Sequence, residues 1–200
     1  MLHPPPSMGL DNRKFGFWAF IASEVLFFSV LIANFLVLSK QDPLGTFHLH
    51  NGTIVSGREI LNIPLTAFNT FVLLTSSFTV VVALEAIKRG QKFKFLTALL
   101  ITGAFGTFFI GVQIFEYYQL IFIEGVGFDT LFGGAFFTLT GFHGAHVIGG
   151  LIWLGIILFK AFGVMGGYSK IDYIGIEIFG LYWHFVDIVW LLLFSLVYLI

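Results

Sequence analysis

The sequence contains no cysteine. Disulfide bonds, thiol nucleophiles, iron–sulfur clusters and copper or zinc sites with cysteine ligands are therefore excluded. Charged residues are also scarce: they make up 10% of the 200 residues, against about 25% in soluble domains. So few charges cannot cover the surface of a soluble globule, which excludes a water-soluble enzyme. The net charge of -1 predicts no surface for binding nucleic acid.

Hydrophobic residues are abundant instead, at 58% of the chain, and 27 residues are phenylalanine. A run of about 20 apolar residues spans the hydrocarbon core of a bilayer. Five such runs occur, and each must be a helix because lipid offers the backbone no hydrogen bonds. The predicted helices cover residues 15–38, 64–87, 95–123, 131–162 and 174–200. The sequence therefore predicts an all-α, polytopic membrane protein with a single transmembrane domain over residues 1–200.

The basic residues predict the orientation, because cytoplasmic loops accumulate lysine and arginine. Eight of the ten would share one side of the membrane: Arg13, Lys14, Lys88, Arg89, Lys92, Lys94, Lys160 and Lys170. We therefore expect a cytoplasmic N-terminus and a C-terminus outside. On the outer side, residues 41–60 form the longest loop. Alternating side chains around Asn51-Gly52 predict a small hairpin within it.

Ionisable residues lie inside the predicted helices, where each costs about 2.5 to 3.5 kcal/mol on insertion scales and is a functional hypothesis by default. Glu24 falls close to the middle of the membrane. With no lysine or arginine at that depth, we expect Glu24 to be protonated, or paired with a histidine or polar group of this chain, a lipid headgroup or another subunit. The others form a candidate internal polar framework: Glu116, His143, His146, Glu177, His184 and Asp187.

The spacing of these residues places them on helix faces. His143 and His146 are three residues apart and share a face. In the last helix, one inward-facing stripe comprises Glu177, Gly180, His184 and Asp187. A two-haem membrane cytochrome needs four axial histidines and only three lie in helices, so a single haem between the last two helices remains the open alternative. No Glu-x-x-His sequence occurs, which disfavours a di-iron centre.

Small residues recur in the fourth predicted helix. Gly141, Ala145 and Gly149 are spaced four residues apart, a pattern that lets helices approach closely in lipid. Gly144 and Gly150 lie alongside them, and we predict that all five residues serve tight packing against another helix. Trp183 and Trp190 are interpreted as interface or packing residues. No residue receives a catalytic or metal-binding role.

Three motifs resemble one known family. They are Tyr182-Trp-His-Phe-Val-Asp-Ile-Val-Trp190, Thr140-Gly-Phe-His-Gly-Ala-His-Val147 and Ala22-Ser-Glu-Val-Leu-Phe-Phe28. Gln113-Ile-Phe-Glu-Tyr117 is similar to a fourth segment. Together, and in this order, they resemble subunit III of the haem-copper terminal oxidases, which use cytochrome c or quinol. Five helices resemble the short bacterial form, which lacks the first two helices of the long form.

This resemblance implies an accessory subunit of a respiratory oxidase in the bacterial cytoplasmic membrane. Such a subunit carries no haem or copper itself and packs against the catalytic subunit I, where oxygen is reduced to water and protons are pumped. The resemblance also implies phospholipid bound in a cleft, support of proton uptake, and protection of the catalytic subunit from inactivation. By its motif, Glu24 resembles the family's carboxylate buried in the membrane. The missing two helices leave open any lipid site that they would complete.

Other functions remain alternatives. A proton-coupled transporter or channel could use the same acids, although we see no inverted repeat. A haem-bearing membrane oxidoreductase would use His184 with His143 or His146. A subunit of a nitric oxide reductase would keep the fold and change the partner. The electron donor of the complex is not encoded in this chain.

Overall fold

The computed structural model describes residues 12–41, 46–48, 54–56, 60–126, 128, 131–162 and 173–199. Five long helices dominate it: α1 (Asn12–Gln41), α3 (Ile63–Lys88), α4 (Lys92–Tyr118), α5 (Leu131–Ala161) and α6 (Ile174–Phe194). One π-helical turn, Gln119–Ile123, extends α4, and another, Ser195–Leu199, extends α6. All five are long and apolar enough to span a membrane. The five-helix prediction is confirmed, and the helix ends lie within three residues of those predicted.

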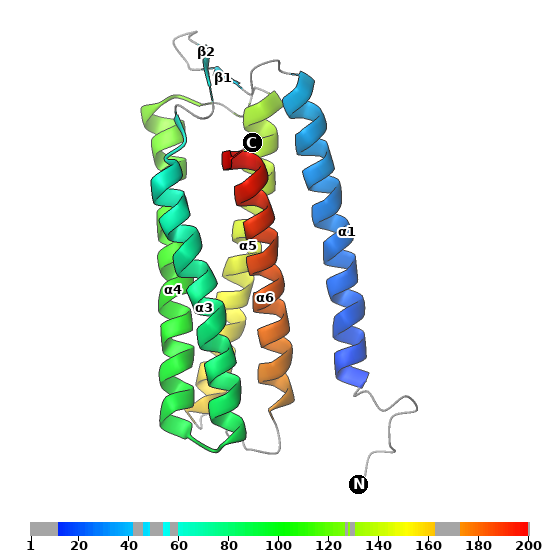
Figure 1. Cartoon of the computed structure of the whole chain (residues 1–200), viewed down its shortest axis with the longest axis vertical. Helices are drawn as coiled ribbons and strands as arrows, with labels where there is room; N and C mark the ends of the chain where they lie inside the picture. The colour runs from blue at the N-terminus through cyan, green and yellow to red at the C-terminus, as the bar shows by residue number, and fades with distance from the viewer. Residues whose placement is uncertain are drawn as a thin grey trace.

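The helices run up and down in an elongated bundle (Figure 1). Helix α3 packs against α4 and α6, and α5 packs against α4 and α6, so these four helices form a closed group. Helix α1 lies at its side and contacts α5 and α6. The polar residues predicted in the helices therefore divide into two sets. One set lies among the four helices of this group, and the other lies where α1 meets α5 and α6.

Local sequence signals explain where α3 begins and ends. Asn62 caps its first turn, with the side-chain oxygen accepting a hydrogen bond from the backbone of Leu65 at 3.1 Å. At the other end, Gly90 adopts a positive φ of 73°. The backbone of Gly90 then donates to Ile87 and that of Gln91 donates to Ala86, closing the helix end. This tight turn brings α4 back antiparallel beside α3.

The strands belong to the loop between α1 and α3. Strand β1 (Thr46–His48) pairs antiparallel with β2 (Ile54–Ser56), and Phe47 lies opposite Val55. This pair falls inside the segment where a hairpin is predicted. The predicted turn at Asn51-Gly52 lies outside the described residues.

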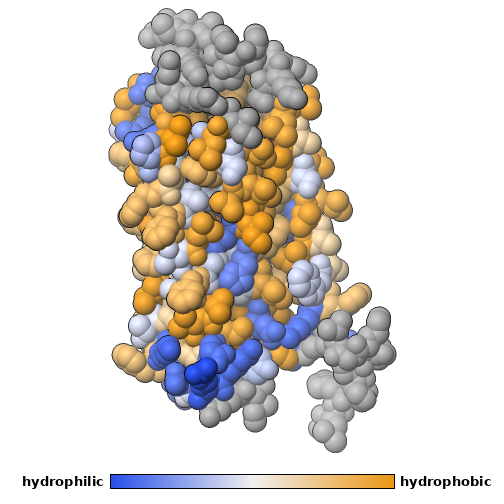
Figure 2. All heavy atoms as spheres, viewed as in Figure 1, coloured by the Kyte–Doolittle hydropathy of each residue, from blue (hydrophilic) through white to orange (hydrophobic). Residues whose placement is uncertain are grey.

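Hydrophobic side chains cover much of the face shown in Figure 2. Large apolar residues are exposed on all five helices; Phe71, for example, is 66% exposed and Ile152 is 63% exposed. Inside, Trp183, Phe109 and Phe179 are almost completely buried. An apolar exterior around an aromatic core is the arrangement expected of helices surrounded by lipid. Which end faces the cytoplasm stays a prediction.

Candidate functional site

Glu24 and His146 form a pair between α1 and α5. The Nε2 atom of His146 lies 3.0 Å from Oε2 of Glu24, and the two side chains are 19% and 17% exposed. Phe28 packs against the imidazole with its ring centroid 5.0 Å away. His146 is the middle residue of α5, and Glu24 lies near the middle of the α1 span. Among the options predicted for Glu24, the structure supplies a histidine of the same chain.

The hydrogen bonds of His146 determine what this pair can do chemically. Nδ1 of His146 lies 2.7 Å from the carbonyl oxygen of Phe142. Because a carbonyl can only accept, Nδ1 must carry a hydrogen. A single further proton is then shared between Nε2 and the Glu24 carboxyl, which are either both neutral or an ion pair. The Glu24–His146 pair can therefore hold one proton at the centre of the span without a lysine or arginine.

His143 does not join this pair, although it lies only three residues away. Its side chain is completely buried between α4, α5 and α6. The imidazole stacks on Trp190 with centroids 4.8 Å apart and meets the edge of Phe109 at 5.9 Å. Neither ring nitrogen has a hydrogen-bond partner among the described residues. The two histidines therefore serve separate environments on neighbouring faces of α5.

His184 and Asp187 are joined through a residue of α3. Nδ1 of His184 lies 2.9 Å from Oγ of Ser77, and Ser77 donates a hydrogen bond to Oδ2 of Asp187. Asp187 is buried, whereas His184 and Ser77 are partly exposed. This series of hydrogen bonds connects the surface of the bundle to a buried carboxyl group and ties α6 to α3.

Glu116 lies further along the bundle, toward the ends of α4 and α6. Thr66 donates to Oε1 of Glu116 at 3.1 Å, and the hydroxyl of Tyr198 donates to Oε2 at 3.1 Å. The carboxyl group is buried, and its two oxygens join α3 to the π-helical turn that follows α6. The neighbouring Gln113 donates to the carbonyl of Thr140 on α5 at 2.9 Å. The geometry at Glu116 is that of a structural cross-link.

Glu177 is set apart from the rest of its predicted stripe. Its carboxylate lies 2.8 Å from Nζ of Lys14 in the first turn of α1, and both side chains are partly exposed. This ion pair fastens α1 to α6 at one end of the bundle. The stripe on α6 therefore divides: Glu177 faces α1, whereas His184 and Asp187 face α3.

Of the five small residues predicted to pack tightly, Gly144 and Gly150 make close contacts, and Gly106 on α4 makes a third that was not predicted. A Cβ added to Gly150 would lie 2.7 Å from the Trp183 ring, and one added to Gly106 would lie 2.9 Å from that ring. A Cβ on Gly144 would lie 3.0 Å from the Gln113 amide. These glycines let α4 and α6 approach α5.

The three small residues spaced four apart, Gly141, Ala145 and Gly149, form a stripe on the outside of α5. Ala145 and Gly149 are exposed, and Gly141 is partly exposed. A Cβ on Gly141 or Gly149 would have only ordinary contacts, at 3.7 and 3.6 Å. Packing of this stripe against another helix stays a prediction.

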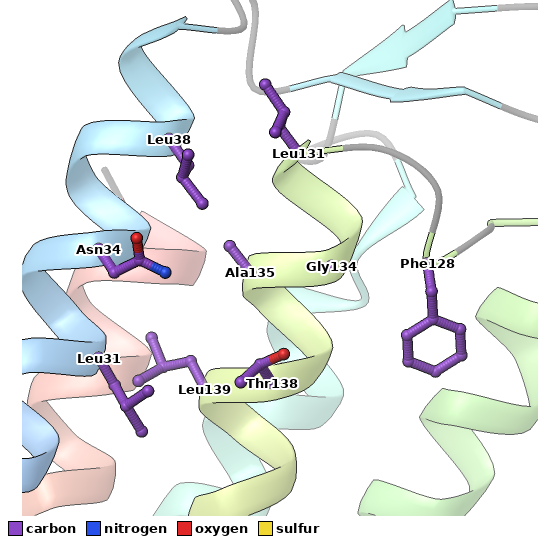
Figure 3. A pocket seen from close by; sticks show the side chains of 9 residues that line it. All are labelled: Leu31, Asn34, Leu38, Phe128, Leu131, Gly134, Ala135, Thr138 and Leu139. Atoms are coloured by element: carbon purple, nitrogen blue, oxygen red, sulfur yellow. The ribbon is translucent and has the colours of Figure 1, made fainter.

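A shallow groove runs between α1 and α5, beyond the Glu24–His146 pair. Figure 3 shows Asn34 on α1 pointing toward α5, with leucine side chains around it. The groove has a volume of about 340 Å³. Its lining comprises Leu31, Asn34, Leu38, Phe128, Leu131, Gly134, Ala135, Thr138 and Leu139. Its side chains are thus mainly apolar, with one polar side chain from each helix, Asn34 on α1 and Thr138 on α5.

The packing around His143 bears on the haem alternative. Among the described residues, no three histidine, aspartate or glutamate side chains gather as a metal site. A porphyrin ligated by His143 would have to displace the rings of Trp190 and Phe109 that pack on it.

Several partners were missed in the sequence because they are small polar or aromatic residues. Nε1 of Trp183 donates to Ser76 at 2.8 Å, and Nε1 of Trp190 donates to Thr70 at 2.9 Å. Both indoles are buried inside the bundle, so their role is packing rather than the membrane interface. One pattern in the sequence could have identified these partners. Polar residues recur along α3 at helical spacing: Thr66, Asn69, Thr70, Ser76 and Ser77.

The family model for cytochrome c oxidase subunit III matches residues 7–200. The chain belongs to this family. Subunit III of the cytochrome c oxidase of Alkalihalophilus pseudofirmus is 32% identical over 191 residues, covering 94% of this chain and 86% of the relative. Subunit 3 of the cytochrome bo(3) ubiquinol oxidase of Pseudomonas aeruginosa is 33% identical over 94% of this chain and 85% of the relative. Subunit 3 of the quinol oxidase of Bacillus subtilis is 35% identical over 92% of this chain and 85% of the relative.

The subunit III match and five spanning helices identify a multi-pass membrane protein of a haem-copper oxidase. The relatives include subunits of both cytochrome c and quinol oxidases at similar identity. The electron donor therefore stays undetermined.

Proposed function

We propose that this chain is the accessory subunit III of a bacterial respiratory haem-copper oxidase, packed against the catalytic subunit I in the cytoplasmic membrane. The observation that carries the proposal is the subunit III match over residues 7–200. In this assignment, haem and copper belong to partner subunits. The chain takes no part in the redox steps of oxygen reduction, and its work is to stabilise the catalytic subunit and support its proton supply.

The Glu24–His146 pair is the part of the chain that we assign to proton uptake. The pair lies at the middle of the span, holds one proton and remains partly exposed where α1 meets α5. With one shared proton, Glu24 and His146 together carry no net charge. The pair therefore needs no counter-ion. Exposure allows water or a neighbouring subunit to reach the pair.

The groove between α1 and α5 is the site that we assign to phospholipid. Its leucine side chains suit an acyl chain, and Asn34 and Thr138 can hydrogen-bond ester oxygens. The groove and the Glu24–His146 pair lie along the same α1–α5 contact. Lipid in the groove would therefore hold α1 against α5 and fix the position of Glu24.

The assignment of the complex is tested by purifying the tagged chain in mild detergent. We expect haem-containing subunits to co-purify, and a colourless chain to remain after they are stripped away. A chain that purifies alone, or that keeps haem after stripping, would contradict the accessory assignment.

The role of the pair is tested in the intact complex with Glu24→Ala and Glu24→Gln. Both variants should leave the haem spectra unchanged. Glu24→Ala should speed the loss of activity during turnover, because His146 loses its partner. Glu24→Gln keeps a hydrogen bond but cannot release a proton, so it should also inactivate faster than the unchanged enzyme. Inactivation of both variants at the rate of the unchanged enzyme would remove the carboxyl group from the proposal.

A control variant separates this effect from a general loss of charge. Glu85 forms an exposed ion pair with Arg89 at the end of α3. We expect Glu85→Ala to inactivate at the rate of the unchanged enzyme, because an exposed pair contributes little to stability.

A further inference from the structure

The turn between α3 and α4 gathers positive charge at one end of the bundle. Four basic side chains occur within seven residues there, and all four are exposed: Lys88, Arg89, Lys92 and Lys94. Backbone hydrogen bonds from Gly90 to Ile87 and from Gln91 to Ala86 hold the turn in one shape. Figure 2 shows hydrophilic atoms gathered at the lower end of the face that carries α3 and α4, directly below the hydrophobic surface of the helices.

Two of the four basic residues have a partner within the chain. Nε of Arg89 lies 2.7 Å from Oε1 of Glu85 in an exposed ion pair. Nζ of Lys88 lies 5.0 Å from the centroid of the Tyr173 ring. Lys88 also lies in the last turn of α3, where the helix dipole favours a positive charge. Both residues therefore stabilise the local structure of the chain.

Lys92 and Lys94 have no such role. They occupy the first turn of α4, where the helix dipole disfavours a positive charge. That turn contains no acidic residue, and neither lysine forms an ion pair with another described residue. The preference of basic residues for one side of the membrane accounts for lysines in this loop, but not for their place in the first turn of a helix. A negative charge from outside the chain would relieve the unfavourable interaction with the dipole.

The position of the two lysines indicates the kind of anion. The α3 span ends at Lys88 and the α4 span begins at Lys92, so the turn lies where the apolar surface ends. Phe93 stands between the two lysines and is 84% exposed. Side chains in a helix lean toward its N-terminus, so Lys92 and Lys94 reach past the start of α4 toward the lipid headgroups. An acidic protein segment in water would match the lysines but not Phe93, whereas a phospholipid offers both a phosphate and an acyl chain.

We propose that the turn between α3 and α4 binds an anionic phospholipid, with the headgroup within reach of Lys92 and Lys94 and an acyl chain against Phe93. The site is distinct from the groove between α1 and α5, which is lined by Leu38 and Leu131 at the opposite end of the bundle. The inference goes beyond the proposed function and does not depend on the oxidase assignment.

Native mass spectrometry of the full chain in mild detergent tests the site. The chain is titrated with phosphatidylglycerol and with phosphatidylcholine of identical acyl chains, and the two affinities are compared. The unchanged chain should prefer phosphatidylglycerol. Each basic residue near an anionic surface contributes about five-fold to binding, so Lys92→Gln should reduce the preference about five-fold, and Lys92→Gln with Lys94→Gln about 25-fold. Equal affinity of the unchanged chain for the two lipids would overturn the inference.

A matched control separates a local site from a general effect of charge. Lys14→Gln also removes one positive charge at this end of the bundle, but from the ion pair with Glu177 between α1 and α6. It should change the preference less than two-fold, and a reduction equal to that of Lys92→Gln would overturn the site. Sodium phosphate should displace the lipid no better than sodium chloride of equal ionic strength. Specific displacement by phosphate would indicate a site for soluble phosphate and would overturn the assignment to lipid.

Melting temperatures distinguish lipid binding from a structural role of the lysines. Without lipid, the double variant should melt no lower than the unchanged chain, because it removes charges that the dipole disfavours. Phosphatidylglycerol should raise the melting temperature of the unchanged chain more than that of the variant. A variant that melts lower without lipid would assign Lys92 and Lys94 to folding and overturn the inference. So would an intact complex whose preference for phosphatidylglycerol is unaffected by the double change, because another subunit would then occupy the turn.

Discussion

Replacing Gly150 with alanine adds one methyl group where the backbone of α5 meets the Trp183 ring of α6 most closely. The new Cβ would lie 2.7 Å from Cζ3 of Trp183 and 2.9 Å from Cε3. Carbon atoms in packed interiors sit about 3.5 to 4.0 Å apart, so the indole must move by about 1 Å. Trp183 is buried, and its Nε1 is bound to Ser76 at 2.8 Å. The ring therefore cannot move freely.

The expected loss of stability follows from two opposing contributions. Overpacking a core costs about 1 to 3 kcal/mol, whereas exchanging glycine for alanine within a helix gains about 1 kcal/mol. Gly149→Ala has the same gain from exchanging glycine for alanine but no overpacking. Its Cβ would lie 3.6 Å from the Tyr182 hydroxyl, which is an ordinary contact. The difference between the two variants isolates the clash. We expect Gly150→Ala to be less stable than Gly149→Ala by about 1 to 3 kcal/mol.

Equilibrium unfolding of the purified chain measures this difference. Each variant is unfolded in mixed micelles with increasing dodecyl sulfate, and the loss of helix is followed by circular dichroism. The midpoint for Gly150→Ala should fall below that for Gly149→Ala. Coinciding midpoints would refute the reasoning, because they would mean that Trp183 yields to the methyl group at no cost.

Two further predictions concern hydrogen bonds, and each has a control in the same chain. Tyr198→Phe removes the donor to Glu116 and should lower the unfolding free energy by about 0.6 to 2 kcal/mol, whereas Tyr118→Phe, at an exposed position, should leave the unfolding midpoint unchanged. Asn62→Ala removes the cap of α3 and should cost about 0.5 to 2 kcal/mol, whereas Gln91→Ala at the start of α4 should cost nothing, because Gln91 makes no side-chain cap bond. Equal effects within either pair, measured by the same unfolding experiment, would contradict these assignments.

The sequence predicted the helices well because the membrane imposes a simple rule. A span must be apolar over about 20 residues and must satisfy its backbone internally. Hydropathy therefore located all five spans, even where a helix ends in a π-helical turn, as at Ser195–Leu199. The family could also be recognised from the sequence, because each of the motifs around Glu24, His143 and His184 is a contiguous segment of the chain.

Helix-face arguments predicted the polar sites less completely. Spacing placed His143 and His146 on one face, but the faces of a helix in a bundle look onto different neighbours. His146 meets Glu24 on α1, whereas His143 meets Trp190 on α6. Periodicity along one helix contains no information about which other helix stands opposite, so these partners could not be predicted from the sequence.

By itself, the sequence determined that the chain has five spanning helices, carries ionisable groups at membrane depth and belongs among subunits III. Each follows from local composition or from contiguous motifs. The tertiary structure alone decided that Glu24 pairs with His146, that Ser77 joins His184 to Asp187, and that Gly106 and Gly150 are the glycines that admit Trp183. The physical reason is that these contacts join residues up to 122 positions apart. Their distances depend on how the helices pack around the indole rings, and no segment of the sequence records that packing.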